Sequence, residues 1–423
     1  MANVVCTSVN VRALASFLEP LFPTFRFHAS FLDVLKDGTF DGRRGTFHPF
    51  AAHFAAPLPP VTDAHKVSAM PFSVGSEFAG LNVPVLALKM LGLEPVMTEK
   101  FLSEKDPMCQ RMLLWHFPRT QIMYSRVENR NDAPYVDVYI TCFPCQPFSD
   151  AGMRRGAGDP RGRLVDESLT YIRAKRPRVV LLENVSGLYF RFRELFDSVL
   201  DALETEGYTI LNRDYPLFNT KGHGIPQNRR RVIVGAVKTE FYQASAFDVP
   251  DELGDCIKLD ALVMDQPRGV PGGLPPTGDP YRKKVMRAFK LARMRGLDPA
   301  TDLVVVDTGA SDAFSKFVVG VLPCVTATRG KCRRYFLSTM GKNMTVRIME
   351  RCQAFPEKFF QPRKCGVSKS VYGGMIGNSV SVNVFMRLWP KILLAAGLCR
   401  RLPEDYWATA VATLKTRGMV QNS

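Results

Sequence analysis

A cysteine follows a short apolar segment and precedes a basic, glycine-rich stretch. Pro144-Cys145-Gln146 ends the run VDVYITCF, and the residues after it read PFSDAGMRRGAGDPRG. The thiolate is the reactive form of cysteine, but at a free pKa near 8.5 only about 3% is ionised at neutral pH. The arginines of the following stretch favour ionisation, so we predict that Cys145 is a nucleophile beneath a mobile loop.

Taken alone, Cys145 has other interpretations. A single cysteine is more often a buried and inert residue than a nucleophile. Cys142 adds a CxxC pair, which is typical of redox and zinc sites. The redox and zinc interpretations are weakly supported, because Cys142 lies within the apolar run and no second CxxC completes a tetrahedral zinc site.

A carboxylic acid and two arginines follow at other apolar segments. Glu183 ends the run PRVVLLENV, and it faces the same sheet edge as Cys145 if the two strands are neighbours. Partial burial raises a carboxyl pKa and suits proton donation, although a helix-capping carboxylate explains Glu183 equally well. Arg229 and Arg231 lead into VIVGAV and share one side of an extended chain, where two guanidinium groups suit a phosphate or a polarised carbonyl.

The segments that carry these residues alternate with helical patterns. Short β-branched runs bounded by polar turns are typical of buried parallel strands, and PVLALKMLG and FRELFDSVLDALETEGYT have helical periods. Strands that alternate with helices predict an α/β fold with a doubly wound, mostly parallel sheet, which binds ligands at the carboxyl ends of its strands.

The charge of the chain is unevenly distributed. The 423 residues carry a formal net charge of +16, and residues 321–423 hold 17 Lys and Arg against 4 Asp and Glu. This surplus favours a polyanionic partner, although a solvated basic face explains it as well. A second basic cluster at 282–295 has apolar residues at Val285, Phe289 and Ala292, which predicts an amphipathic helix with a basic outer face. Proline- and glycine-rich turns around it mark a small module at about 240–320.

Four short motifs together resemble the cytosine-C5 methyltransferase family. They are Pro144-Cys145-Gln146, Glu183-Asn184-Val185, Gln227-x-Arg229-x-Arg231 and Gly377-Asn378-Ser379-Val380, and they occur in the order of the family. The resemblance covers residues of about 71–237 and 321–395. It implies a class I SAM-dependent methyltransferase fold with a small target-recognition insertion.

The resemblance also implies a reaction and a set of catalytic residues. Cys145 would attack carbon 6 of a flipped-out cytosine, Glu183 would stabilise the ring protonated at N3, and Arg229 and Arg231 would hold the base carbonyl or a flanking phosphate. Carbon 5 would then accept a methyl group from S-adenosyl-L-methionine. No metal is implied. Further contacts to double-stranded DNA are expected from Gln146 and Ser149 in the loop and from Arg287 and Lys290 in the basic helix.

The same resemblance predicts the cofactor pocket, which departs from the family in two places. The family usually has glycines where this chain has Asn82 and Val83, and because Val83 cannot easily adopt a positive φ, this turn must differ locally. The acid that meets the adenine is replaced, with Ser125 near its place and Glu128 as the nearest carboxylate. Weakened cofactor binding is therefore one hypothesis. The residues expected to bind the cofactor are Phe78, Gly80, Glu104, Pro144, Asn378 and Ser379.

Two rival functions remain at this stage. One branch of the family modifies tRNA, but the Cys-Phe-Thr signature of that branch is missing from the recognition region. A catalytically silent nucleic-acid-binding scaffold is the other rival. A DNA substrate implies a nuclear protein in a eukaryote and a cytoplasmic one otherwise, and we expect a monomer without membrane segments. The expected domains are an N-terminal extension at 1–70, a catalytic domain at 71–238 and 321–395, a target-recognition region at 239–320, and a tail at 396–423.

Overall fold

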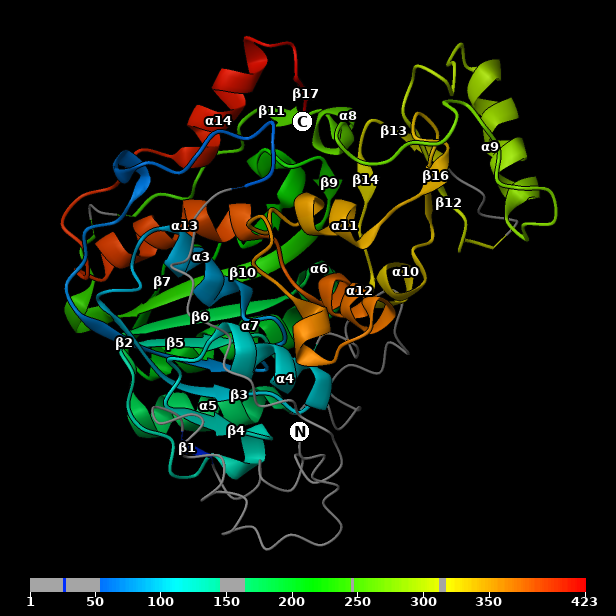
Figure 1. Cartoon of the computed structure of the whole chain (residues 1–423). Helices are drawn as coiled ribbons and strands as arrows, with labels where there is room; N and C mark the ends of the chain where they lie inside the picture. Colours follow the sequence, from blue (N-terminus) through cyan, green and yellow to red (C-terminus); the bar gives the residue numbers. More distant parts are fainter. Residues whose placement is uncertain (1–25, 28–53, 145–163, 245–246, 312–316) are drawn as a thin grey trace, which may run out of the picture.

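A nine-stranded, mostly parallel sheet forms the centre of the computed structural model, which describes residues 26–27, 54–144, 164–244, 247–311 and 317–423 (Figure 1). The predicted α/β class is therefore confirmed. In sheet order, the strands are β1 (Arg26–Phe27), β4 (Ile122–Tyr124), β3 (Met97–Ser103), β2 (Phe72–Glu77), β5 (Val138–Thr141), β6 (Val179–Val185), β10 (Arg230–Lys238) and β7 (Tyr208–Ile210), with β8 (Leu217–Asn219) paired to β10.

One long strand runs against the others. β10 pairs antiparallel with both β6 and β7, whereas β2, β3, β4, β5 and β6 are mutually parallel neighbours. Because β10 is antiparallel, its first residues, including Arg231, lie beside the carboxyl end of β6. The sheet thus brings the arginine motif and the Glu183 motif to the same edge.

Helices cover both faces of this sheet. Successive residues of a strand point to opposite faces, and in β5 the side chains of Val138 and Ile140 join one core cluster while Tyr139 joins the other. The first cluster includes α3 (Val83–Met90) and α13 (Val382–Ala395), and the second includes α5 (Leu164–Lys175) and α7 (Arg193–Thr205).

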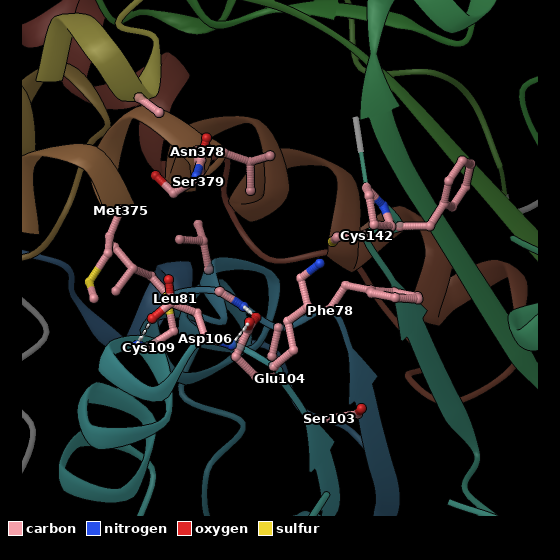
Figure 2. A pocket seen from close by; sticks show the side chains of 18 of the residues that line it. Phe78, Leu81, Ser103, Glu104, Asp106, Cys109, Cys142, Met375, Asn378 and Ser379 are labelled. Carbon is pink, nitrogen blue, oxygen red and sulfur yellow. Dashed lines mark hydrogen bonds between the residues drawn. The ribbon is translucent and has the colours of Figure 1, made fainter. Parts of the chain in front are cut away.

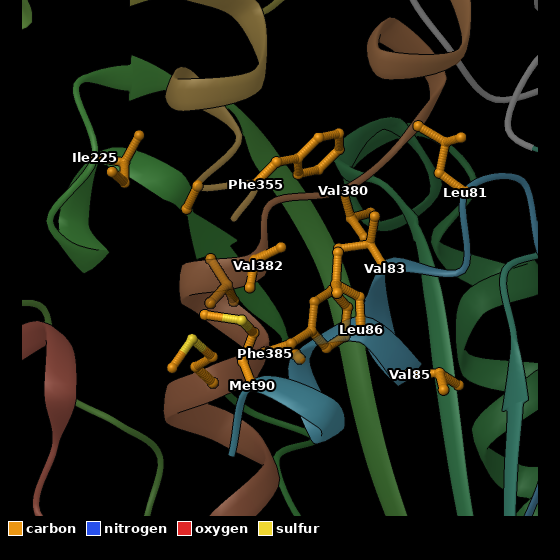
Figure 3. Close-up of a cluster of buried hydrophobic side chains, with 14 of the residues drawn as sticks. Leu81, Val83, Val85, Leu86, Met90, Ile225, Phe355, Val380, Val382 and Phe385 are labelled. Carbon is orange, nitrogen blue, oxygen red and sulfur yellow. The ribbon is translucent and has the colours of Figure 1, made fainter. Parts of the chain in front are cut away.

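The packing of α3 on α13 brings together the two parts of the expected catalytic domain, 71–238 and 321–395 (Figure 3). Val83 and Leu86 of α3 meet Val382 and Phe385 of α13 in one buried cluster. The indole N–H of Trp389 also donates to the carbonyl of Pro84, at 2.9 Å. Burying several large aliphatic and aromatic side chains stabilises this contact by about 1.5–3 kcal/mol for each side chain. It holds the turn after β2 close to the segment that follows Gly377.

A second, smaller sheet has its own core. Its antiparallel strands, in order, are β13 (Phe317–Val319), β12 (Val304–Asp307), β15 (Tyr335–Leu337) and β16 (Lys342–Asn343). The helix α9 (Arg282–Met294) packs on it through Val285, Ala288, Phe289 and Ala292. The predicted amphipathic helix is therefore confirmed. Lys283, Arg287, Lys290 and Arg293 are exposed on its outer side, whereas Arg282 and Lys284 are partly buried and donate to backbone carbonyls.

The remaining elements connect the large and the small sheet and include the C-terminal segment. A short strand β14 (Leu322–Pro323) pairs with β9 (Gln227–Asn228), and β11 (Asp255–Ile257) pairs with β17 (Val420–Asn422). No helix within the described ranges is long and apolar enough to cross a membrane. The other α-helices are α4 (Pro107–His116), α6 (Ser186–Arg191), α8 (Leu259–Val263), α10 (Ala327–Cys332), α11 (Val346–Cys352), α12 (Lys369–Asn378) and α14 (Tyr406–Lys415).

Candidate active site

A cavity of about 970 Å³ opens at the carboxyl ends of the parallel strands. The cavity is lined by residues that directly follow β2, β3 and β5, by Glu183 of β6 and by the end of α12. Figure 2 shows Asn378 and Ser379 on one side of this cavity, with Phe78 and Glu104 across from them. All six residues expected to bind a cofactor line this cavity: Phe78, Gly80, Glu104, Pro144, Asn378 and Ser379.

The turn after β2 adopts a left-handed backbone at three alternate positions. Phe78, Gly80 and Asn82 have φ values of 52°, 55° and 51°. Asparagine tolerates this conformation better than most residues, and the Asn82 side chain is fixed by a 2.9 Å hydrogen bond from the Ser76 hydroxyl. Val83 is the first residue of α3 and needs no positive φ. In this turn Asn82, and not Val83, therefore takes the left-handed conformation.

Glu104 joins this turn to the end of β3. Its Oε2 accepts a hydrogen bond from the Gly80 N–H at 2.7 Å, and its Oε1 accepts one from the Asp106 N–H at 2.8 Å. Burial raises the pKa of Glu104, while these two backbone donors oppose the rise. A carboxylate has about four acceptor positions, so both oxygens can accept further hydrogen bonds from hydroxyl groups in the cavity.

These features fit a nucleoside cofactor. The cavity lies within the range of about 300–1,000 Å³ typical of small-molecule sites. Phe78 and Val127 offer apolar surface, Glu104 offers acceptors, and a Cβ atom added at Gly80 would meet no atom within 4 Å. Glu128 also lines the cavity, whereas Ser125 is buried and is not part of the wall. Among the described residues, no group of three or more His, Cys, Asp or Glu side chains could hold a metal ion.

The other end of the cavity is built around Glu183. β5 and β6 are parallel neighbours, so Glu183 lies beside the segment that leads to Pro144. The Asn184 side chain donates to the carbonyl of Phe143 at 3.2 Å and ties the two strand ends together. Sequence reasoning gave Asn184 no role of its own. Burial raises the pKa of Glu183 above its usual value, although Arg231 and Arg229 oppose the rise.

The two arginines of the predicted pair have different partners. Arg231 lies diagonally across the β6–β10 ladder from Glu183, with its Nε 3.3 Å from Oε1. Arg229 is only 1% exposed, and its guanidinium group donates to the backbone carbonyls of Val325, Gly377 and Ser379. Arg229 therefore anchors the Gly377 motif to the arginine motif, whereas Arg231 pairs with the acid.

The helix α10 contributes residues that the sequence did not reveal. Thr328 and Lys331 line the cavity because α10 packs closely on α12. A Cβ added at Gly330 would lie 2.0 Å from the Gly373 carbonyl oxygen, so only glycine permits this approach. A TRG sequence gives no indication of such a long-range contact.

The remaining expected residues fall into two groups. Cys145, Gln146 and Ser149 lie outside the described residues, whereas Pro144 and Cys142 line the cavity. Cys142 directly follows β5, so the expectation that it lies within the strand is wrong. Arg287 and Lys290 are exposed on α9 and do not belong to the cavity wall.

The sheet order and a cavity at the strand ends define an α/β methyltransferase fold. A solved methyltransferase of Entamoeba histolytica has this fold, with a TM-score of 0.53 and 16% identity over 76% of this chain and 98% of that one. The model of the family "C-5 cytosine-specific DNA methylase" matches residues 72–268. This match covers just under half of the 423 residues, and it supports the cytosine-C5 methyltransferase family for this chain.

Curated relatives of this family are bacterial. The chain is 27% identical over 326 residues to the type II methyltransferase M.HaeII of Haemophilus aegyptius, covering 77% of this chain and 93% of that protein. It is 30% identical over 207 residues to the type II methyltransferase M.NgoBV of Neisseria gonorrhoeae, covering 46% of this chain. That match spans 45% of the relative, so less than half of M.NgoBV is represented.

Proposed function

We propose that the protein is a DNA cytosine-5 methyltransferase that uses Cys145 as its nucleophile. The observation that carries this proposal is one cavity that joins a nucleoside-type pocket to a buried acid beside Pro144, the residue bonded to Cys145. Three family motifs that are far apart in the sequence thus border one space, and the fourth reaches it through the contact of Arg231 with Glu183. The match to the family of C-5 cytosine-specific DNA methylases supports DNA as the substrate.

Each residue of the expected cofactor pocket has a proposed role. S-adenosyl-L-methionine, when bound, supplies an activated methyl group. Glu104 would accept hydrogen bonds from the ribose hydroxyls, Phe78 would pack on the base, and Glu128 is the carboxylate available to its amino group. Gly80, Asn378, Ser379 and Pro144 would shape the part of the pocket that leads toward Cys145.

The chemical step follows from the need to activate a poor nucleophile. Attack of the Cys145 thiolate on carbon 6 of cytosine forms a carbon–sulfur bond and moves electron density to carbon 5. Glu183, whose pKa is raised by burial, supplies the proton that stabilises the ring at N3. After methylation, the carbon-5 proton passes to water, N3 returns its proton to Glu183, and expulsion of the thiolate restores the aromatic ring. Arg231 would hold the base carbonyl, and Arg229 would act through the backbone that it anchors.

Substrate binding requires the base to leave the duplex, at a cost of a few kcal/mol. Contacts to phosphates would offset this cost. We assign them to the loop with Gln146 and Ser149 and to Arg287 and Lys290 on α9. The target-recognition region would consist of α9 and the whole small sheet. It would therefore include β15 and β16 beyond residue 320. With DNA as substrate, the protein acts in the cytoplasm of a bacterium or the nucleus of a eukaryote.

A parallel assay separates this proposal from its two rivals. Purified protein receives methyl-labelled S-adenosyl-L-methionine with either duplex DNA or tRNA, and calorimetry measures binding of the cofactor alone. The proposal predicts label in DNA cytosine and measurable cofactor binding. Label in tRNA alone would favour the RNA-directed enzyme, and an absence of cofactor binding would favour the scaffold.

A further inference from the structure

A second cysteine lies beside the acid–arginine pair. Cys324 directly follows β14, and β14 pairs in parallel with β9, so Cys324 comes opposite Arg229. The Nη1 atom of Arg229 donates to the Cys324 sulfur at 3.3 Å. The guanidinium group of Arg231 also hydrogen-bonds to this sulfur. The thiol is half-buried between two guanidinium groups.

The acid, the two arginines and the cysteine form a row of four side chains in which each contacts the next. Glu183 contacts Arg231, Arg231 contacts Cys324, and Cys324 contacts Arg229. With a neutral thiol, the cluster holds two cations and a single carboxyl group. With a thiolate, the charges balance when Glu183 is ionised, and one positive charge remains when it is protonated.

The electrostatics favour the charged sulfur. Burial raises the pKa of the Cys324 thiol, but Arg229 and Arg231 outweigh burial, and the pKa is lowered overall. Two further ionisable groups, Tyr335 and Asp307, lie on the paired strands β15 and β12. Tyr335 donates its hydroxyl to the Cys324 carbonyl at 2.9 Å, and Asp307 is paired with Arg329 at 2.9 Å. The two guanidinium groups are therefore the charged groups that hydrogen-bond to the sulfur.

We propose that Cys324 is a positioning residue of the active site, which holds Arg229 and Arg231 and offsets part of their charge beside Glu183. This inference rests on the proposed function. An anion near the arginine pair makes a proton on Glu183 less costly, because part of the positive potential that opposes protonation is cancelled. Cys324 thus acts through the arginines and touches no reacting atom.

The first test concerns the sulfur and needs no methyl transfer. The ultraviolet absorbance of the thiolate is titrated as the difference between wild type and Cys324→Ser. Site-resolved alkylation of wild type by iodoacetamide across the same pH range gives a second measurement that needs no variant. The proposal predicts half-ionisation below the value of about 8.5 for free cysteine. Ionisation at or above that value would overturn it.

The second test measures the pH dependence of methyl transfer to duplex DNA. In Cys324→Ser, the side chain cannot ionise, so Glu183 loses its proton more easily and its limb of the pH profile moves to lower pH. The expected shift is about one pH unit, because the sulfur acts on Glu183 only across the intervening Arg231. Cys332→Ser, which changes an exposed cysteine on α10, is the matched control and should leave the profile unchanged.

The outcomes of the two tests are separable. A low thiol pKa with an unshifted profile in Cys324→Ser would overturn the positioning role and leave the proposed function intact. An inactive wild type on every nucleic acid would refute the proposed function, while the sulfur titration would still decide whether Cys324 is ionised. A simple packing defect would lower activity at every pH equally, which also contradicts the proposal.

Discussion

The two ends of the cavity hold their polar groups in different ways. At the cofactor end, two backbone N–H groups, that of Gly80 in the left-handed turn and that of Asp106, bind one carboxylate, Glu104. At the base end, the polar groups are side chains: Arg231 pairs with Glu183, and Arg229 donates to the sulfur of Cys324. The first arrangement fixes a shape, and the second fixes a protonation state.

This difference predicts different consequences of mutation. A change at the cofactor end alters the geometry of a turn and should appear as lost cofactor affinity. A change at the base end alters charge and should appear in the rate and its pH dependence. A substitution at the cofactor end that changed mainly the pH dependence of the rate would contradict this comparison. So would one at the base end that lowered mainly the cofactor affinity.

The largest expected effect is that of Glu183→Gln. The amide keeps the size of the side chain but cannot supply a proton, so kcat should fall about 10²- to 10⁴-fold, the range for loss of general acid catalysis. Steady-state methyl transfer measures the fall, and the pH limb that belongs to Glu183 should vanish. Glu194→Gln, on the exposed side of α7, is the control. An equal loss of cofactor affinity would contradict the division between the two ends.

Arg229→Ala tests whether this arginine serves the protein more than the substrate. Truncation removes the donor to three backbone carbonyls and opens a buried cavity, so unfolding free energy should drop by about 3 kcal/mol. Denaturant titration measures the drop. The neighbouring exposed residue supplies the control, because Arg230→Ala should cost less than about 0.5 kcal/mol. Unchanged stability in Arg229→Ala would show that its contacts are not structural.

At the cofactor end, Glu104→Gln should weaken cofactor binding by about tenfold or more. The amide would turn a donor toward the N–H of Gly80 or Asp106, and a buried donor without an acceptor costs about 1–3 kcal/mol. Calorimetry gives the affinity, and kcat at saturating cofactor should change much less. Glu128→Gln is the companion variant, since this carboxylate is exposed and should contribute less. A larger effect at Glu128 would reverse the assignment.

The smallest effect is expected far from the cavity, on α9. Reversing both charges with Arg287→Glu and Lys290→Glu should weaken DNA binding severalfold and reduce the salt slope by about 2, one for each phosphate contact. Binding titrations at several salt concentrations measure the slope, and cofactor affinity should stay the same. Arg400→Glu with Arg401→Glu reverses two exposed charges elsewhere as the control. An unchanged slope would leave α9 a solvated face.

Much of the fold could be predicted from the apolar segments. The runs ending in Phe143 and Val185 have the composition of strands buried on both faces, and β5 and β6 are such strands. The direction of β10 could not be predicted, because a strand buried on both faces has the same composition whether it is parallel or antiparallel. Burial selects composition, whereas direction depends on the connections.

The site was predictable to a similar extent. The end of an apolar strand indicated Glu183, because polar residues at strand ends meet at one sheet edge, and the family resemblance indicated Glu104. Spacing placed Arg229 and Arg231 on one side, but it could not tell which backbone carbonyls would accept from Arg229. Nor could it indicate Cys324, which reaches the cluster only through the pairing of two very short strands.

The most direct test of the account is covalent trapping on a modified duplex. DNA that contains 5-fluorocytosine, in place of cytosine, retains the adduct because the fluorine cannot leave as a proton does. Wild type with S-adenosyl-L-methionine should give a denaturation-resistant protein–DNA complex, and Cys145→Ser should give none while still binding DNA. A complex that persists in Cys145→Ser, or none with active wild type, would contradict Cys145 as the nucleophile.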